Sequence, residues 1–281
     1  MNNYTVNFTT PEESTNSTTD SFWLLKSLQI SIVSINLLFG FPTHCYIIWL
    51  IITGTGSGVA SEFFILNLSV CELGVCLNCL FYIMSVCFQR ISELLLFLLG
   101  LSITGRPVFQ CLICVERYLA VVQPVTFLKY KPLRYRVICC AVAWITILGS
   151  CFCSLFIDFT KNGQMKKTIL SLQFLPTLSI QLFCVVAVLR ALKQTGPGER
   201  KREREEENHM KRRAFQIILI TTVSMAIIYG PFATLGLFTI LTNHYIHKLW
   251  NTGLICYILA GFVQPALYLH RTGKLWCTMK W

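Results

Sequence analysis

The stretch CLICVERYLAVVQPVTFLKYKPLRY, from Cys111 to Tyr135, decides how the rest of the chain is interpreted. An apolar run ends in Glu116-Arg117-Tyr118, a further apolar turn follows, and then come a proline and a loop rich in Lys and Arg. An acid–base pair at the end of a membrane-length helix is costly unless it lies at the water boundary or is paired. Clustered Lys and Arg beside a membrane span mark the cytoplasmic side. The stretch therefore predicts the inner end of a membrane-spanning helix.

The composition excludes an ordinary soluble domain, because 54% of the 281 residues are hydrophobic and only 13% are charged. The formal net charge is +11, but the basic residues gather in a few inter-helix segments rather than on one face, so no nucleic-acid partner is expected. Most of the 14 cysteines lie inside apolar runs, where cysteine packs as a small hydrophobe. None of the Cys-x-x-Cys pairs has zinc-site spacing to a second pair, so no metal or cofactor is expected.

Seven apolar segments are each near or above the roughly 20 residues that a helix needs to cross a bilayer. They lie near residues 27–53, 61–88, 93–122, 137–157, 168–192, 214–241 and 249–270. Because lipid offers no hydrogen-bond partner to an unpaired backbone group, segments joined in this way can only be helices. The sequence predicts an all-α membrane protein, a seven-transmembrane helix bundle over residues 25–270.

The two ends of the chain are expected on opposite sides of the membrane. Residues 1–24 are predicted to be a disordered extracellular tail, glycosylated at the Asn-x-Ser/Thr sequences of Asn3, Asn7 and Asn16. Lys and Arg gather after the third and fifth spans and in the C-terminal tail, which places those segments in the cytoplasm. The expected location is the plasma membrane, with the amino terminus outside.

Residues 271–281 are expected to form a short cytoplasmic tail with an in-plane helix. Its apolar residues can share one face while its basic residues lie near lipid phosphates, so membrane lipids are expected partners. Cys277 in this segment is a candidate for palmitoylation.

Two ionisable residues, Glu72 and Arg106, lie well inside predicted spans. Each alone costs at least a few kcal/mol at mid-bilayer, depending on the scale. We therefore predict a buried ion pair between the second and third helices. The alternative is that one of the two side chains reaches backbone carbonyls or water instead.

The motifs along the chain resemble those of rhodopsin-like (class A) G-protein-coupled receptors. The family has Asp/Glu-Arg-Tyr at the end of helix three, as in Glu116-Arg117-Tyr118 here. Tyr229-Gly-Pro231 resembles the family's Trp-x-Pro switch of helix six, with Tyr in place of Trp. Gln264-Pro265-Ala-Leu-Tyr268 resembles the family's Asn-Pro-x-x-Tyr, and Asn67-Leu-Ser-Val-Cys-Glu72 its Asn-Leu-x-x-x-Asp. The basic loop after the third span and Gly40-Phe-Pro42 in the first span are similar to the branch with purinergic, protease-activated and hydroxycarboxylic-acid receptors.

This resemblance implies roles for individual residues. The coupling and switch residues would be Glu116, Arg117, Tyr118, Tyr229, Pro231, Pro265 and Tyr268, with a heterotrimeric G protein as the partner. The family's acidic residue at the Glu72 position helps to bind a sodium ion. Here the matching helix-three position is Arg106, whose positive charge implies that no sodium site exists.

A ligand would enter from outside, between an apolar wall and a basic rim. An apolar cavity under a basic rim suits an anionic lipid or a small acidic metabolite, although the rim residues can equally be ordinary solvated loop residues. The candidates are Arg90, Leu96, Leu99, Lys166, Lys167, Phe232, His247, Lys248, Leu254 and Tyr257.

The resulting interpretation is a receptor that binds an extracellular ligand and activates a G protein. The chain lacks the common catalytic motifs of hydrolases and metalloproteases, so it is not expected to be an enzyme. The alternative is a non-signalling scavenger or trafficking protein of the same fold, because several switch positions depart from the family pattern.

Overall fold

The computed structural model describes residues 24, 26–54, 62–85, 91–130, 132–159, 176–188, 190–191, 253 and 255–271, together with isolated positions between 216 and 242. Within these residues, four helices are long and apolar enough to cross a membrane. They are Lys26–Ile52, which contains the π-helical turn η1 (Asn36–Gly40) and α2 (Phe41–Ile52), then α3 (Phe63–Ser85), α4 (Ser92–Val122) and α6 (Leu133–Phe159).

Shorter helical segments accompany these four, and three of them have defined bounds within the described residues. Two are shorter apolar helices: Pro176–Val188, and Ile255–His270, which contains η3 (Ala260–Phe262) and all of α10 (Val263–Arg271) except its last residue. The third is α5 (Pro124–Tyr130), between α4 and α6. The first four predicted spans correspond to the four long helices, and parts of the fifth and seventh are helical. The sixth span falls almost wholly outside the described residues, as does the expected in-plane helix after Arg271.

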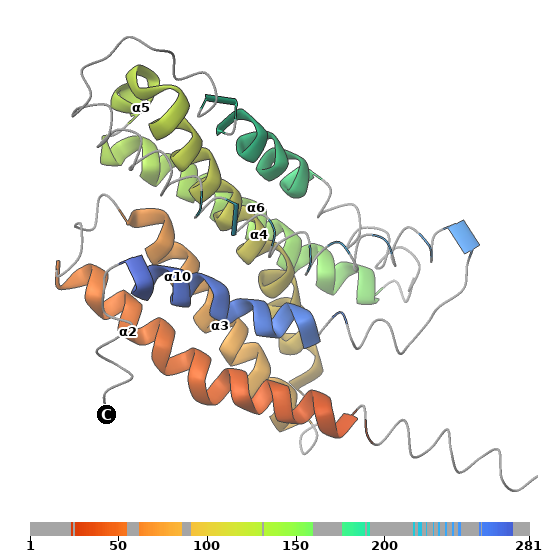
Figure 1. Ribbon diagram of the computed structural model, residues 1–281. Coiled ribbons are helices and arrows are strands. Elements are labelled where there is room, and N and C mark those ends of the chain that lie inside the picture. The colour runs from red at the N-terminus through yellow and green to blue at the C-terminus, as the bar shows by residue number, and fades with distance from the viewer. Residues whose placement is uncertain are drawn as a thin grey trace, which may run out of the picture.

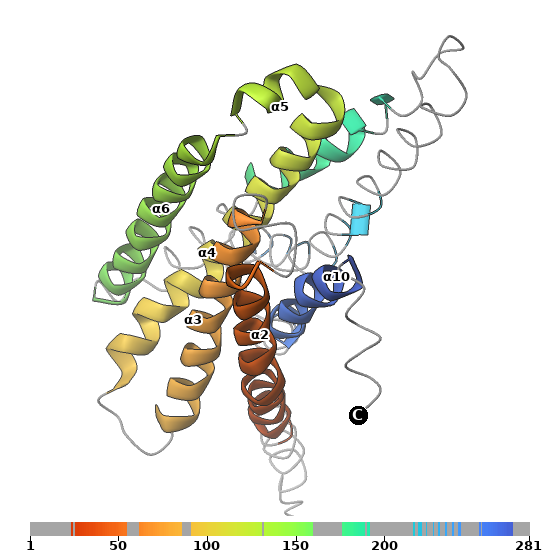
Figure 2. The same ribbon diagram turned by 90° about the vertical axis from the view of Figure 1, so that its left-hand side faces the viewer.

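Helix α4 is the centre of the described bundle. It packs against α3 on one side and α6 on another, and α2 packs against α3. Figures 1 and 2 show α2, α3 and α10 side by side, with α5 at one end of α4 and α6. We refer to this end as the α5 end of the bundle. Glu116, Arg117 and Tyr118 lie there, in the last two turns of α4.

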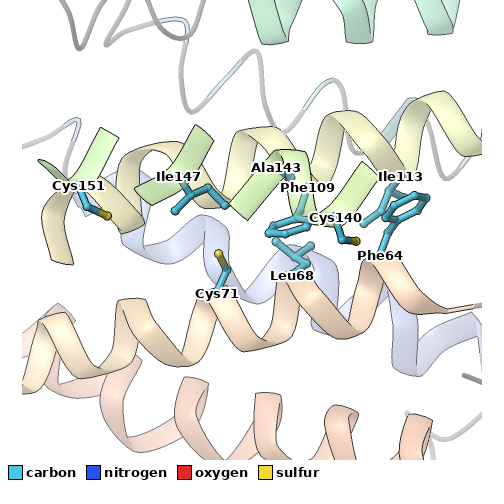
Figure 3. Packing of buried hydrophobic residues seen from close by; sticks show 9 residues of the cluster. All are labelled: Phe64, Leu68, Cys71, Phe109, Ile113, Cys140, Ala143, Ile147 and Cys151. Carbon is cyan, nitrogen blue, oxygen red and sulfur yellow. The ribbon is translucent and has the colours of Figure 1, made fainter. Parts of the chain in front are cut away.

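The largest apolar cluster joins α3, α4 and α6. On α6, Cys140, Ala143, Ile147 and Cys151 follow each other at spacings of three or four residues, so they share one face of the helix. Figure 3 shows this face against residues of α3 and α4 that include Leu68 and Phe109. Helices in lipid associate through close van der Waals packing, which small side chains such as that of Ala143 promote.

Gly100 of α4 permits a close approach between α4 and α6. A Cβ atom at this position would lie 2.6 Å from the Cα of Cys151 and 2.8 Å from its backbone nitrogen. Backbone atoms cannot move aside as a flexible side chain can, so only glycine fits here without separating α4 from α6.

A polar contact adds to the packing between α3 and α6. The Trp144 indole Nε1 donates a hydrogen bond of 2.9 Å to the Asn67 side-chain oxygen, and the indole meets the Phe109 ring edge-on at a centroid distance of 5.6 Å. A buried indole N–H needs such an acceptor. Asn67 of the Asn-Leu-x-x-x-Asp-like motif is therefore a packing residue between helices.

Candidate functional site

A buried ion pair lies in the middle of the bundle. The Arg106 Nε atom is 2.5 Å from Glu72 Oε1, and Arg106 Nη2 is 2.7 Å from Glu72 Oε2, so the contact is bidentate. Arg106 is only 1% exposed and Glu72 only 4%. The planar guanidinium matches both carboxylate oxygens at once, which a lysine could not do. The pair joins α3 to α4.

Tyr257, before η3, brings the seventh helix to this ion pair. Arg106 Nη1 donates a hydrogen bond to the Tyr257 carbonyl oxygen, and the guanidinium carbon lies 4.3 Å from the centre of the Tyr257 ring. The Tyr257 hydroxyl donates to the carbonyl oxygen of Ser102. The arginine thus satisfies its donors with a carboxylate and a backbone carbonyl, as a buried guanidinium must.

Residues of the first helix enclose the same region. His44 is buried, and its Nδ1 atom has no hydrogen-bond partner. Asn36 lies in the π-helical turn η1, where its Nδ2 donates to the Cys79 sulfur at 3.5 Å. π-helical turns inside α-helices often occur at functional sites. Gly261 of η3 lies against the ion pair, because a Cβ atom there would be 3.0 Å from Arg106 Nη2.

We call Asn36, His44, Glu72, Ser102, Arg106, Tyr257 and Gly261 the polar cluster. Its members come from four segments of the chain that are predicted to be separate spans. Among the described residues, no group of three His, Cys, Asp or Glu side chains is placed to hold a metal ion.

Three of the ligand candidates lie within the described residues. Tyr257 belongs to the polar cluster, and Leu99 packs beside it against an apolar cluster that includes Ile103 and Ile258. Leu96 is half-buried one turn earlier on α4. The structure therefore brings Leu99 and Tyr257 together.

At the α5 end of the bundle, the Glu-Arg-Tyr residues point in different directions because successive residues of a helix are about 100° apart. Glu116 Oε1 lies 2.6 Å from Arg136 Nη2 of α6. Tyr118 faces the opposite way, with its ring 5.7 Å from that of Phe183 in the helix Pro176–Val188. Arg117 lies between these two directions and is half-buried.

The short helix α5 exposes apolar side chains next to this triplet. Val125 is 82% exposed and Leu128 is 64% exposed, and their spacing of three residues puts them on one face. Phe127 is partly buried. An exposed apolar face on a loop helix indicates a surface that contacts lipid or another protein.

Tyr268, the last residue of the Gln264-Pro265-Ala-Leu-Tyr268 motif, makes a buried contact at this end of the bundle. The Tyr268 hydroxyl of α10 donates a hydrogen bond of 2.6 Å to Glu62 Oε2, just before α3. Both residues are buried, and Tyr268 packs in a cluster with Ile47 and Leu50 of α2. Pro265 lies near the start of the same helix α10. The remaining candidates lie outside the described residues: Asn3, Asn7, Asn16, Arg90, Lys166, Lys167, Tyr229, Pro231, Phe232, His247, Lys248, Leu254 and Cys277.

The sequence interpretation overlooked two residues of these contacts, Arg136 and Glu62. Arg136 belongs to the run of basic residues that follows the third predicted span, and it precedes Cys140 by four residues, so it lies on the face of α6 that packs on α4. This four-residue spacing is the sequence feature that predicts a position of Arg136 at the interface between α4 and α6. The pairing of Glu62 with Tyr268 joins residues 206 positions apart, and nothing in the local pattern pointed to it.

Comparison with known proteins places these contacts in a family context. The family described as 7 transmembrane receptor (rhodopsin family) matches residues 44–268, well over half of the 281 residues. Chemokine XC receptor 1 from Homo sapiens is 24% identical over 228 residues, covering 75% of this chain and 65% of that receptor. Hydroxycarboxylic acid receptor 2 from Rattus norvegicus is 24% identical over 223 residues, covering 71% of this chain and 59% of that receptor. The human form of the latter gives 24% over 225 residues and the same coverage. The matched part thus spans less than two thirds of the length of these receptors.

Proposed function

Since the chain belongs to the 7 transmembrane receptor (rhodopsin family), a family of multi-pass membrane receptors, we propose that it is a plasma-membrane receptor that activates a heterotrimeric G protein. In this proposal the amino terminus is extracellular and the α5 end of the bundle faces the cytoplasm. The tails 1–24 and 271–281 flank a transmembrane domain over residues 25–270.

The observation that carries the proposal is the arrangement around Arg117. The arginine is half-buried between Glu116 and Tyr118, whose side chains contact two different helices. Next to it, α5 exposes Val125 and Leu128. A fixed positive charge beside an apolar face can receive the end of a partner helix, with the charge at its carbonyl terminus and the apolar residues against its side.

The proposed ligand is an anionic lipid or a small acidic metabolite that binds from the outer side. Leu99 and Tyr257, which pack in one apolar cluster, support an apolar inner wall for such a ligand. The relatives include a receptor named for hydroxycarboxylic acids, which is in keeping with an acidic ligand.

The alternative, a non-signalling scavenger or trafficking protein, also has a supporting observation. The contact of Arg106 with both Glu72 and Tyr257 ties three predicted spans together at their centre. Such a contact stabilises one arrangement of the helices, whereas a signalling receptor must adopt two.

The two functions are separated by measuring G-protein dissociation in cells that express a panel of Gα subunits. The cells receive no ligand, or a panel of fatty acids, lysophospholipids and small carboxylic acids. We expect wild-type protein to activate at least one subunit and Arg117→Ala to abolish this at matched surface expression. Arg134→Ala, which removes an exposed arginine of the same region, serves as the control. A wild-type signal no higher than that of cells without the protein, at confirmed surface expression, would support the non-signalling alternative.

A further inference from the structure

The ion pair between Glu116 and Arg136 lies where α5 leaves the bundle. The atoms Glu116 Oε1 and Arg136 Nη2 are 2.6 Å apart, and the two side chains are 12% and 7% exposed. One partner belongs to the last turns of α4 and the other to the first turn of α6, so the pair closes the base of the loop that contains α5.

The position of this pair follows from the packing of the two helices. In the apolar cluster, the members nearest to the α5 end are Ile113 on α4 and Cys140 on α6. Glu116 follows Ile113 by three residues and Arg136 precedes Cys140 by four, so each lies one turn further on the same face. The ion pair is therefore the next layer of the α4–α6 interface and the layer closest to the loop.

The loop itself is held close to α4 by backbone hydrogen bonds. The Gln123 N–H donates to the Leu119 carbonyl at 3.0 Å, and the Phe127 N–H donates to the Gln123 carbonyl at 2.9 Å. Only Gln123 separates the end of α4 at Val122 from the start of α5 at Pro124. Any change in the separation of the ends of α4 and α6 is transmitted to α5, because the short segment between α5 and α6 gives little slack.

We propose that Arg136 is a positioning residue for α5: by holding Glu116, it fixes the ends of α4 and α6 and so sets the direction in which Val125 and Leu128 face a G protein. The identity of the partner rests on the proposed function, whereas the effect on α5 does not. Removing one charge of the pair leaves the other enclosed without its counter-charge, which favours separation of the two helix ends.

The experiment that isolates this role is amide hydrogen exchange of the purified full chain in lipid nanodiscs. The signal followed is the Phe127 amide and the peptide that covers α5. The variants are Arg136→Gln, Glu116→Gln, the double variant and Arg136→Lys. The matched control is Arg134→Gln, two positions away, because Arg134 is exposed and lies outside this ion pair.

We expect Arg136→Gln and Glu116→Gln each to accelerate exchange in α5 about tenfold, equivalent to about 1.4 kcal/mol of local opening. The double variant accelerates it no more than either single variant, since both remove the same interaction. Arg136→Lys keeps a cation within reach of Glu116 and restores most of the protection. Arg134→Gln leaves exchange unchanged.

Nucleotide exchange on a purified G protein is measured on the same samples, and it separates the two proposals. A slower G-protein response in Arg136→Gln, rescued in Arg136→Lys, supports both. Faster amide exchange in α5 without any G-protein response from the wild type supports the role of Arg136 and contradicts the proposed function.

Two results overturn the inference. One is unchanged amide exchange in α5 of Arg136→Gln, and the other is acceleration by Arg136→Gln that adds in full to that of Glu116→Gln. If the single variants do not reach the membrane, recovery of surface expression in the double variant supports the pairing, and failure to recover counts against it.

Discussion

The hydroxyl group of Tyr268 donates a hydrogen bond of 2.6 Å to the carboxylate of Glu62, although 206 residues separate them in the sequence. Glu62 is only 1% exposed, and Tyr268 packs among the apolar residues Ile47, Leu50 and Ile51 of α2. The contact ties the end of the last described helix to the start of α3. A buried carboxylate requires hydrogen-bond donors, so this contact contributes to keeping α10 in its observed position.

Replacing Tyr268 by phenylalanine removes this donor and keeps the ring. We expect Tyr268→Phe to destabilise the protein by about 1–3 kcal/mol, because a donor to a buried carboxylate is lost. Glu62→Gln should have a smaller effect when combined with Tyr268→Phe than alone. The measurement is the apparent melting temperature of purified protein. Tyr46→Phe, a tyrosine packed against the same apolar cluster, is the control and should change little.

The ion pair of Glu72 and Arg106 should be far more sensitive to the loss of one partner than to the loss of both. Glu72→Gln leaves the guanidinium enclosed without its counter-charge, which we expect to cost about 3–5 kcal/mol. The double variant Glu72→Leu with Arg106→Met replaces the pair by apolar groups and should recover much of this loss. The loss and the recovery are measured as changes in the melting temperature of the purified protein and in its expression at the cell surface. Glu93→Gln, which alters an exposed acidic residue on α4, should behave as the wild type. A double variant less stable than Glu72→Gln would contradict the expectation.

The same ion pair leads to a prediction about sodium. The Arg106 guanidinium contacts both oxygens of Glu72, so its charge competes with any cation for that carboxylate. We expect the melting temperature of the wild type to be equal in sodium chloride and in choline chloride at the same ionic strength. Arg106→Ser frees the carboxylate and vacates space, and it should make the melting temperature sodium-dependent. Stabilisation of the wild type by sodium that disappears in Glu72→Ala would show the expectation to be wrong.

Gly261 provides a steric test of the polar cluster. An added Cβ atom would lie 3.0 Å from Arg106 Nη2 and 3.4 Å from Glu72 Oε2. Because both side chains are fixed by their mutual contact, Gly261→Ala should destabilise the protein by about 1–3 kcal/mol. At Gly149 of α6 an added Cβ atom meets nothing within 4 Å, so Gly149→Ala should be neutral or slightly stabilising. Equal melting temperatures of the two variants would contradict the tight packing at Gly261.

Sequence reasoning reached the fold and part of the polar cluster because both follow from the cost of polar groups in lipid. An isolated charge at membrane depth is so unfavourable that an ion pair between Glu72 and Arg106 could be predicted from their positions in the sequence. The role of Tyr257 in the same cluster could not be found in this way. Arg106 binds its backbone carbonyl, which every residue possesses and no sequence pattern marks.

The contacts at the α5 end show a different limit. Lys and Arg residues directly after a span are ordinarily interpreted as markers of the cytoplasmic side, and Arg136 follows the third predicted span in this way. In the structure the Arg136 guanidinium is buried against Glu116 of α4. It lies one turn beyond Cys140, on the face of α6 that also carries Ala143. Extending the periodic face of a helix past its last apolar residue would have found this contact. The partner of Glu62 depends on how distant helices pack, which local spacing does not encode.

The exposed face of α5 leads to the last prediction. Val125 and Leu128 are mostly exposed, so replacing them with serine removes little buried surface and should leave the melting temperature almost unchanged. If this face contacts a G protein, Val125→Ser with Leu128→Ser should lower the rate of nucleotide exchange on the G protein by about tenfold, equivalent to about 1.4 kcal/mol. Thr126→Ser, a conservative change on the same helix, is the control. Amide exchange in α5 should stay as in the wild type, because the change affects what the helix contacts and not how it is held. A normal nucleotide-exchange rate in the double variant would mean that the face lies against lipid instead.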